Sequence, residues 1–137
     1  IGFIGNDKKL DIIKNLMTYP TYQEYIGCEY FTDYIGIPQR QAVEAGITEQ
    51  LLESVKKSTC KIFLIGAGVC KLKFYNKLKE QKNCVYIDVG HGLDAVAGIA
   101  DNTRPYFGNW QNYKIRNYDY SNIDYCAGPS GRTGITL

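Results

Sequence analysis

The chain has 137 residues, of which 45% are hydrophobic and 22% charged, and its formal net charge is +2. This length suits one globular domain with its own core. So small a charge, without a long basic run, argues against a nucleic-acid partner. No apolar segment reaches the ~20 residues that span a bilayer. We therefore expect an ordinary globular domain without a membrane span.

The first part of the chain predicts a strand followed by a helix. Ile1-Gly2-Phe3-Ile4-Gly5 is apolar and ends at a turn, as a short buried strand does. Asn6 can cap the helix that follows, and apolar residues repeat at helical spacing up to about Thr18. Pro20 marks the expected end of this helix.

A second strand and helix are expected in the next forty residues or so. Aromatic and β-branched residues over 28–37 favour extended structure, which Pro38 closes. Much of 39–57 has helical character, with a break near Gly46. Thr48 can cap the second half of this helix.

The stretch that follows is the most informative part of the sequence. An apolar run ends in Gly66-Ala67-Gly68, a lysine-rich helix is expected over about 69–81, and a second apolar run over 84–87 ends in Asp88. Strand, glycine turn, helix, strand and acidic residue in this order are typical of an α/β nucleotide-binding unit. The alternation along the whole chain predicts an α/β, Rossmann-like fold with a mainly parallel sheet and helices on both faces.

Two lysines in the expected first turn of the 69–81 helix are candidate phosphate ligands. Lys71 and Lys73 lie beside the glycine turn, where their charge opposes the helix dipole. A bound phosphate would offset this cost, whereas a solvated cationic face is the alternative interpretation. The inward face of the helix is expected to carry Val69, Leu72, Tyr75 and Leu78.

Polar residues after the second apolar run are candidates for catalysis. His91 is the only histidine and lies in a glycine loop at the carboxyl end of a strand, where a base would be useful. Asp94 can orient it or bind a hydroxyl, and Arg104 suits a phosphate or carboxylate. An NAD-dependent oxidoreductase is a lower alternative, because Lys71 replaces the third glycine of a dinucleotide fingerprint. A methyltransferase is another lower alternative, because residues 88–92 are similar to a methyltransferase glycine motif but do not follow the first strand.

Cysteines and acidic residues offer no recognisable metal site. The five cysteines are widely and irregularly spaced, with no Cys-x-x-Cys pair. Cys60, Cys70 and Cys84 lie in or beside apolar runs, where thiols pack as small hydrophobic groups. We expect structural or free thiols, no metal ligands, and a reducing compartment such as the cytoplasm.

Taken together, Leu64–Val69, Val85–His91 with Asp94, and Thr103-Arg104 resemble the GT-D-type glycosyltransferase fold. The resemblance is specific from about Ile62 to Arg104, is fainter over 1–38, and does not cover the sequence after Trp110. It implies a domain over 1–127 that handles a nucleotide-activated sugar. The expected catalytic residues are Asp88, His91 and Asp94, and the expected substrate-binding residues are Gly66, Gly68, Lys71, Lys73, Gly90 and Arg104.

The resemblance implies transfer of a sugar from a nucleotide-sugar donor to a hydroxyl of a glycan or protein acceptor. Members of the family also hold a divalent metal through an Asp-x-Glu motif near their N-terminus, and this chain has no such motif. Its cofactor is therefore unknown. Manganese or magnesium would need ligands from sequence outside this chain.

The final residues suggest a different setting. In the tail over 128–137, the three triplets of residues 128–136 place glycine at every third position, as at the start of a collagen-like Gly-X-Y repeat. A transferase-like domain joined to such a repeat resembles collagen-like proteins of large DNA viruses. The alternative function is thus a non-catalytic folded cap or assembly module of a surface fibre. It would be virion-associated and homotrimeric through the collagen-like region.

Overall fold

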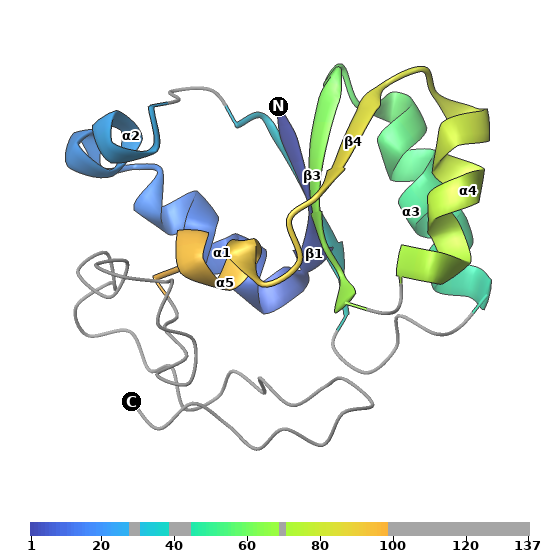
Figure 1. Cartoon of the computed structure of the whole chain (residues 1–137), viewed down its shortest axis with the longest axis horizontal. Helices are drawn as coiled ribbons and strands as arrows, with labels where there is room; N and C mark the ends of the chain where they lie inside the picture. Colours follow the sequence, from blue (N-terminus) through green and yellow to red (C-terminus); the bar gives the residue numbers. More distant parts are fainter. Residues whose placement is uncertain (28–30, 39–44, 69–70, 99–137) are drawn as a thin grey trace.

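A computed structural model describes residues 1–27, 31–38, 45–68 and 71–98 of the chain (Figure 1). Its elements, in chain order, are β1 (Gly2–Asn6), α1 (Asp7–Leu16), α2 (Pro20–Ile26), β2 (Asp33–Ile37), α3 (Ala45–Lys57), β3 (Ile62–Gly66), α4 (Lys71–Gln81), β4 (Val85–Asp88) and α5 (Gly92–Val96). The predicted collagen-like tail, Arg104 and the end of the domain predicted for 1–127 lie outside the described residues.

The described strands form one parallel sheet in the order β2-β1-β3-β4. Ile4 of β1 lies opposite Ile35 on one side and Ile65 on the other, and Ile65 lies opposite Asp88 of β4. The chain moves from β1 outward to β2, then crosses back over β1 to β3. The strand order therefore reverses between β1 and β3, which is the topological switch point where α/β sheets bind ligands.

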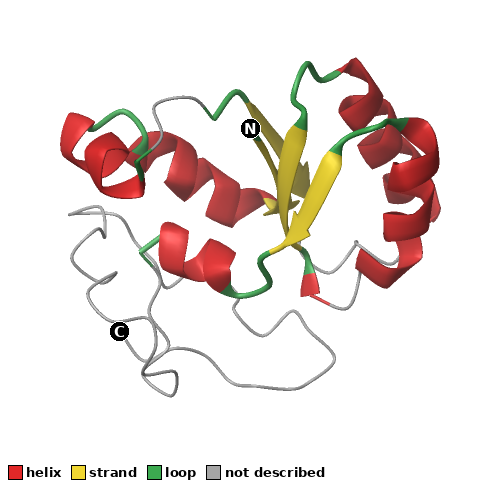
Figure 2. Ribbon diagram, turned by 45° about the horizontal axis from the view of Figure 1, so that its top comes forward, coloured by secondary structure: helices red, strands yellow, loops and turns green. Residues whose placement is uncertain are grey.

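Helices cover both faces of the sheet (Figures 1 and 2), as the sequence predicted. On one face, α1, α2 and α5 enclose a core that includes Phe3, Ile13 and Leu93. On the other face, α3 and α4 enclose a second core that includes Phe63 and Leu78. The predicted Rossmann-like α/β fold is confirmed. None of the described helices is long and apolar enough to cross a bilayer.

The first helices differ from their predicted bounds. Asn6 caps α1 as expected, its side chain accepting from the Lys9 N–H at 3.2 Å. Pro20 is not simply a stop, because it opens the unpredicted helix α2, where its fixed φ suits the first turn. The helix predicted within 39–57 is α3, which begins at Ala45, next to the break predicted near Gly46, while residues 39–44 lie outside the described part of the chain.

The inward face of α4 differs from the predicted one. Phe74 and Leu78 are buried against the sheet, whereas Leu72 is 75% exposed. The predicted stripe placed Leu72 in line with Leu78 and passed over Phe74. The larger Phe74 lies one turn before Leu78 on the same side of the helix, and this pair sets the rotation of α4 on the sheet.

Candidate functional site

The carboxyl ends of β1, β3 and β4 meet at one edge of the sheet, next to α5 (Figure 2). This edge carries Asn6 at the end of β1, the Gly66–Gly68 turn after β3, and Asp88 at the end of β4. It contains the switch point between β1 and β3. It is therefore where the topology predicts a ligand.

Lys71 and Asp88 form an ion pair at this edge. The Lys71 Nζ donates to Asp88 Oδ2, and Asp88 Oδ1 accepts from the Gly90 N–H at 3.0 Å. The two side chains are 25% and 44% exposed, so water and solutes can reach the pair. The hydrogen bond from Lys71 holds the pKa of Asp88 below its ordinary value, against a small opposing effect of burial, and the Gly90 N–H adds to the lowering.

The lowered pKa bears on the role predicted for Asp88. A carboxylate that is stabilised in its charged form is a weaker proton acceptor. Asp88 is thus better suited to hold the Lys71 ammonium or to accept a hydrogen bond from a hydroxyl than to act as a general base.

Asp94 lies in a different environment from Asp88. It is 8% exposed, and its Oδ1 accepts from the Nζ of Lys9 on α1. Lys71 comes from α4 on the opposite face of the sheet. The two predicted catalytic aspartates are therefore held by lysines from opposite faces, on either side of the switch point, rather than brought together as one pair.

Lys9 was not among the predicted site residues. The signal was present in the sequence, because Lys9 follows the first strand and its capping residue just as Lys71 follows the third strand and its glycine turn. Both lysines lie in the first turns of helices that start at the carboxyl edge. A search for lysine after every predicted strand would have found it.

Three of the predicted glycines have a structural reason that does not involve a ligand. A Cβ at Gly66 would lie 2.6 Å from the Leu93 Cβ, so Gly66 makes room for α5. Gly68 and Gly90 have φ values of 54° and 50°, a left-handed conformation that favours glycine. Nothing lies within 4 Å of a Cβ built at either Gly68 or Gly90.

Leu93 closes the switch point itself. It is 1% exposed, and a Cβ at Gly5 would lie 2.4 Å from its Cδ2. The open part of the carboxyl edge is therefore on the α4 side, around Gly68, Lys71 and Asp88. His91 is exposed beside it at the start of α5, where its carbonyl accepts from the Asp94 N–H at 2.9 Å. Lys73 is exposed two residues after Lys71.

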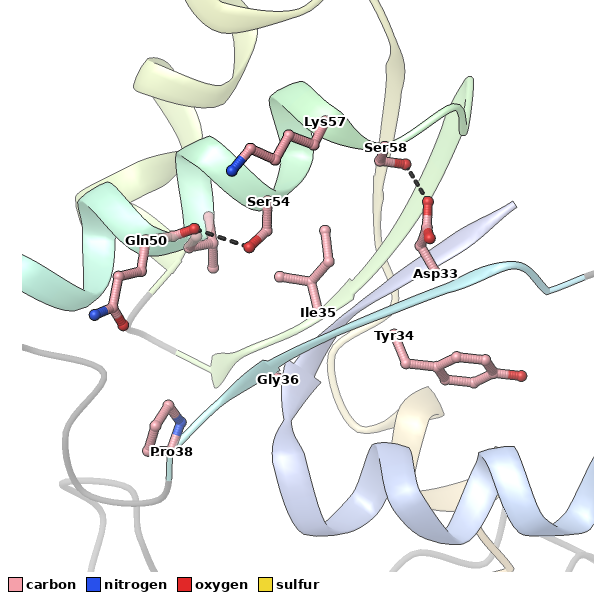
Figure 3. A pocket seen from close by; sticks show the side chains of 10 residues that line it. Asp33, Tyr34, Ile35, Gly36, Pro38, Gln50, Ser54, Lys57 and Ser58 are labelled. Atoms are coloured by element: carbon pink, nitrogen blue, oxygen red, sulfur yellow. Dashed lines mark hydrogen bonds between the residues drawn. The ribbon is translucent and has the colours of Figure 1, made fainter.

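A separate cavity of about 430 Å³ lies between β2 and α3, away from every predicted site residue (Figure 3). It is lined by residues 33–36 and Pro38 on the strand side and by Gln50, Leu51, Ser54, Lys57 and Ser58 on the helix side. Two polar groups on its wall are already bonded. Ser58 Oγ donates to Asp33, and Ser54 Oγ donates to the Gln50 carbonyl at 2.9 Å.

Neither a metal-ligand cluster nor a disulfide occurs in the part of the chain that the structure describes. No three His, Cys, Asp or Glu side chains gather there. Cys60 and Cys84 are free thiols, Cys60 buried and Cys84 half-buried. The other cysteines lie outside the described residues.

Comparisons of the chain with protein-family models, with curated proteins and with solved structures find no match.

Proposed function

We propose that the carboxyl edge binds the diphosphate of a nucleotide sugar and that the domain transfers the sugar to a hydroxyl of a glycan or protein acceptor. The observation that carries this proposal is the position of Lys71. Its ammonium group lies directly after the Gly66–Gly68 turn and reaches the end of β4. A cation there is suited to an anionic ligand bound beyond the strands.

In this proposal Lys71 exchanges part of its contact with Asp88 for the diphosphate. Its charge then offsets the negative charge that develops on the leaving nucleoside diphosphate. The acceptor hydroxyl gives its proton to His91, its oxygen bonds to the anomeric carbon, and the nucleoside diphosphate departs with the electrons of the broken bond. Asp88 holds Lys71, and the buried Lys9–Asp94 pair fixes α5, which carries His91, against α1.

The closed switch point favours a second candidate, a non-catalytic cap or assembly module. Leu93 lies against Gly5 and Gly66, where many α/β domains admit a ligand. A domain kept only for assembly would retain the fold and fill this crevice with an apolar side chain. The two candidates differ in whether the α4 side of the edge binds nucleotides.

Calorimetric titration with UDP, GDP and TDP, each with and without manganese, separates them. We expect one nucleoside diphosphate to bind, and Lys71→Met to weaken it roughly tenfold or more, because a charge-assisted hydrogen bond contributes ~1.5–3 kcal/mol. Lys77→Met is the matched control: it removes the same charge from an exposed position of the same helix. Absence of binding by all three nucleotides would reject the transferase and favour the cap.

Turnover is measured as nucleoside diphosphate released from the sugar donor that binds. We expect His91→Ala to abolish most of this release while leaving nucleotide affinity unchanged. Asp94→Asn should lower both turnover and stability, since it weakens the pair with Lys9. Unchanged turnover in both variants would reject the catalytic assignments.

A further inference from the structure

The two outer strands of the sheet differ in how much apolar surface they leave exposed. On β2, Ile35 and Ile37 are 9% and 4% exposed and pack in the core beneath α3. On β4, Val85 and Ile87 are 55% and 45% exposed. Burial of apolar surface contributes ~25 cal/mol per Å². A partner that covers β4 would therefore bury more apolar surface than one that covers β2, and would be bound more favourably.

The main-chain groups that face outward from β4 follow from its bonds to β3. The N–H groups of Val85 and Val89 donate, each at 2.9 Å, to carbonyl oxygens at either end of β3. Along a strand, the main-chain groups of successive residues point to opposite sides. The N–H and C=O groups of Tyr86 and Asp88 therefore point away from β3, toward the side of β4 on which the described residues place no further strand.

The side chains of this segment form a self-complementary pattern. Val85, Ile87 and Val89 alternate with Tyr86 and Asp88, so the three apolar residues share one face. Val89 packs against the core on the α1 side, and Tyr86 packs against the core on the α4 side. Ile87 is therefore the centre of the apolar row. The residues whose main-chain groups point outward, Tyr86 and Asp88, lie immediately before and after it.

If a second copy of this strand paired with it in the antiparallel direction, apolar residues would lie opposite apolar residues. Val85 of one copy would lie opposite Val89 of the other, and the two Ile87 side chains would lie opposite each other. The main-chain groups of Tyr86 and Asp88 would exchange hydrogen bonds across the junction. Such pairing would satisfy the outward polar groups and cover the exposed valine and isoleucine.

We propose that two copies of this chain form a symmetric dimer in which their β4 strands pair antiparallel about a two-fold axis at Ile87. The two sheets then continue as one, and the interface uses the same surface on both copies, as two-fold dimers do. This surface is separate from the cavity beside β2 and does not depend on the proposed transferase activity.

Charges near β4 give the dimer a characteristic salt dependence. Lys71 reaches Asp88 on β4, and Lys79 lies over the Tyr75 ring, which contacts Tyr86 on β4. The lysines of two paired copies would repel each other across the junction. Salt screens such repulsion between exposed charges. Association should therefore strengthen as salt is added, whereas an interface held by ion pairs would weaken.

Sedimentation velocity of the whole chain, from low to high micromolar concentration, tests the dimer. We expect a monomer–dimer equilibrium that shifts toward dimer with concentration and salt. Ile87→Lys should leave a folded monomer, because Ile87 is 45% exposed and two lysines would meet on the axis. Tyr19→Lys is the matched control: it replaces a 52% exposed apolar residue beside α2, far from β4 in Figure 1, and should still dimerise.

Amide hydrogen exchange of the unmutated protein provides a second readout. Exchange at Tyr86 and Asp88 should slow as protein concentration rises, while exchange at Gly36 on the opposite edge strand should not change. A wild-type chain that sediments as a monomer throughout, or an Ile87→Lys variant that dimerises like the wild type, would overturn the proposal. Slowed exchange at Gly36 instead of Tyr86 would place the dimer contact at β2, and this result would also overturn the proposal.

Discussion

The two ends of the parallel sheet use the same kinds of charged residue in different ways. At the amino end, Asp33 accepts from the Ser58 hydroxyl and, at 3.4 Å, from the Cys60 thiol. Lys82 donates to the main-chain carbonyls of Val55 and Ser58. At the carboxyl end, by contrast, two lysines are paired with two aspartates, and one of these pairs is well exposed.

The difference indicates which end is built to hold the fold and which end can exchange partners. Groups at the amino end bond to hydroxyls and carbonyls of the segments that they connect, so the loss of a partner there loosens the connection between those segments. The Lys71–Asp88 pair is different, because a phosphate oxygen can take the place of the carboxylate at similar distance. Substitutions at the amino end should therefore cost stability, and those around Lys71 should mainly change binding.

The largest effect is expected from Gly66→Ala, because the carboxyl end is tightly packed around this residue. The added Cβ would lie 2.6 Å from the Leu93 Cβ and 3.0 Å from the Gly90 carbonyl oxygen, so α5 must shift. We expect a loss of about 3 kcal/mol in the free energy of unfolding, measured by urea denaturation.

Two further variants test whether Leu93 is the cause. Gly68→Ala should cost only ~1–2 kcal/mol, since its φ is 54° but nothing lies within 4 Å of the new Cβ. In the double variant Gly66→Ala/Leu93→Gly, which also removes the Leu93 Cβ, the combined cost should be smaller than the sum of the two single costs. Full additivity would show that the cost at Gly66 comes from elsewhere.

Asp33→Ala at the amino end should have the next largest effect, about 2 kcal/mol, again by urea denaturation. It leaves the Ser58 hydroxyl without its acceptor and removes one of the two partners of the Cys60 thiol, which also contacts the Thr32 hydroxyl at 3.0 Å and is only 4% exposed. At the other end of the sheet, Asp88→Ala is the matched substitution. It should lower the free energy of unfolding by at most ~1 kcal/mol, because the Lys71–Asp88 pair is exposed. Equal costs for the two aspartates would contradict the distinction between the ends.

Lys82→Met should cost about 1 kcal/mol. The Lys82 ammonium donates to carbonyls at the C-terminal end of α3, where a cation is favoured by the helix dipole. Methionine keeps the apolar stem and removes the donor. Lys79→Met, in the last turn of α4 shortly before Lys82, removes an equal charge that lies over Tyr75 instead, and the thermal unfolding of this variant should change less.

The sequence predicted the fold better than it predicted the site. Alternating apolar runs and helical periodicity sufficed for the parallel α/β sheet, because both signals are local. The pairing of Asp94 with Lys9 is not local, since 85 positions separate the two residues in the sequence. Only the packing of α5 on α1 brings them together, and no spacing rule predicts it.

The glycines show the same limit. Gly66 was predicted as a ligand contact because a glycine turn after a strand often cradles phosphate. Its neighbour Leu93 comes from α5, three elements later in the chain, and the sequence does not indicate that this side chain fills the space. Gly68, whose requirement is the local left-handed conformation, is explained by its own backbone. Local requirements could be predicted, and contacts between distant elements could not.

Lys71→Met should have the smallest effect on stability of these variants. It is also the most direct test of whether the Lys71–Asp88 pair can exchange partners. The Lys71 hydrogen bond lowers the pKa of Asp88, so the pair contributes stability above the ordinary carboxyl pKa and loses it as pH falls through the lowered folded-state pKa. That contribution should be below ~1 kcal/mol because the pair is exposed. NMR titration of the Asp88 carboxyl should show its pKa rising toward the ordinary value in Lys71→Met.

Lys77→Met, which removes the same charge from the same helix, should leave the Asp88 titration unchanged. A nucleoside diphosphate that engages Lys71 should likewise raise the Asp88 pKa in the wild-type protein, because it draws the ammonium away from the carboxylate and adds negative charge nearby. In Lys71→Met the same nucleotide should have little further effect. If a nucleotide binds the wild-type protein but does not change the pKa of Asp88, it binds elsewhere on the molecule. The proposal that Lys71 exchanges Asp88 for the diphosphate would then be wrong.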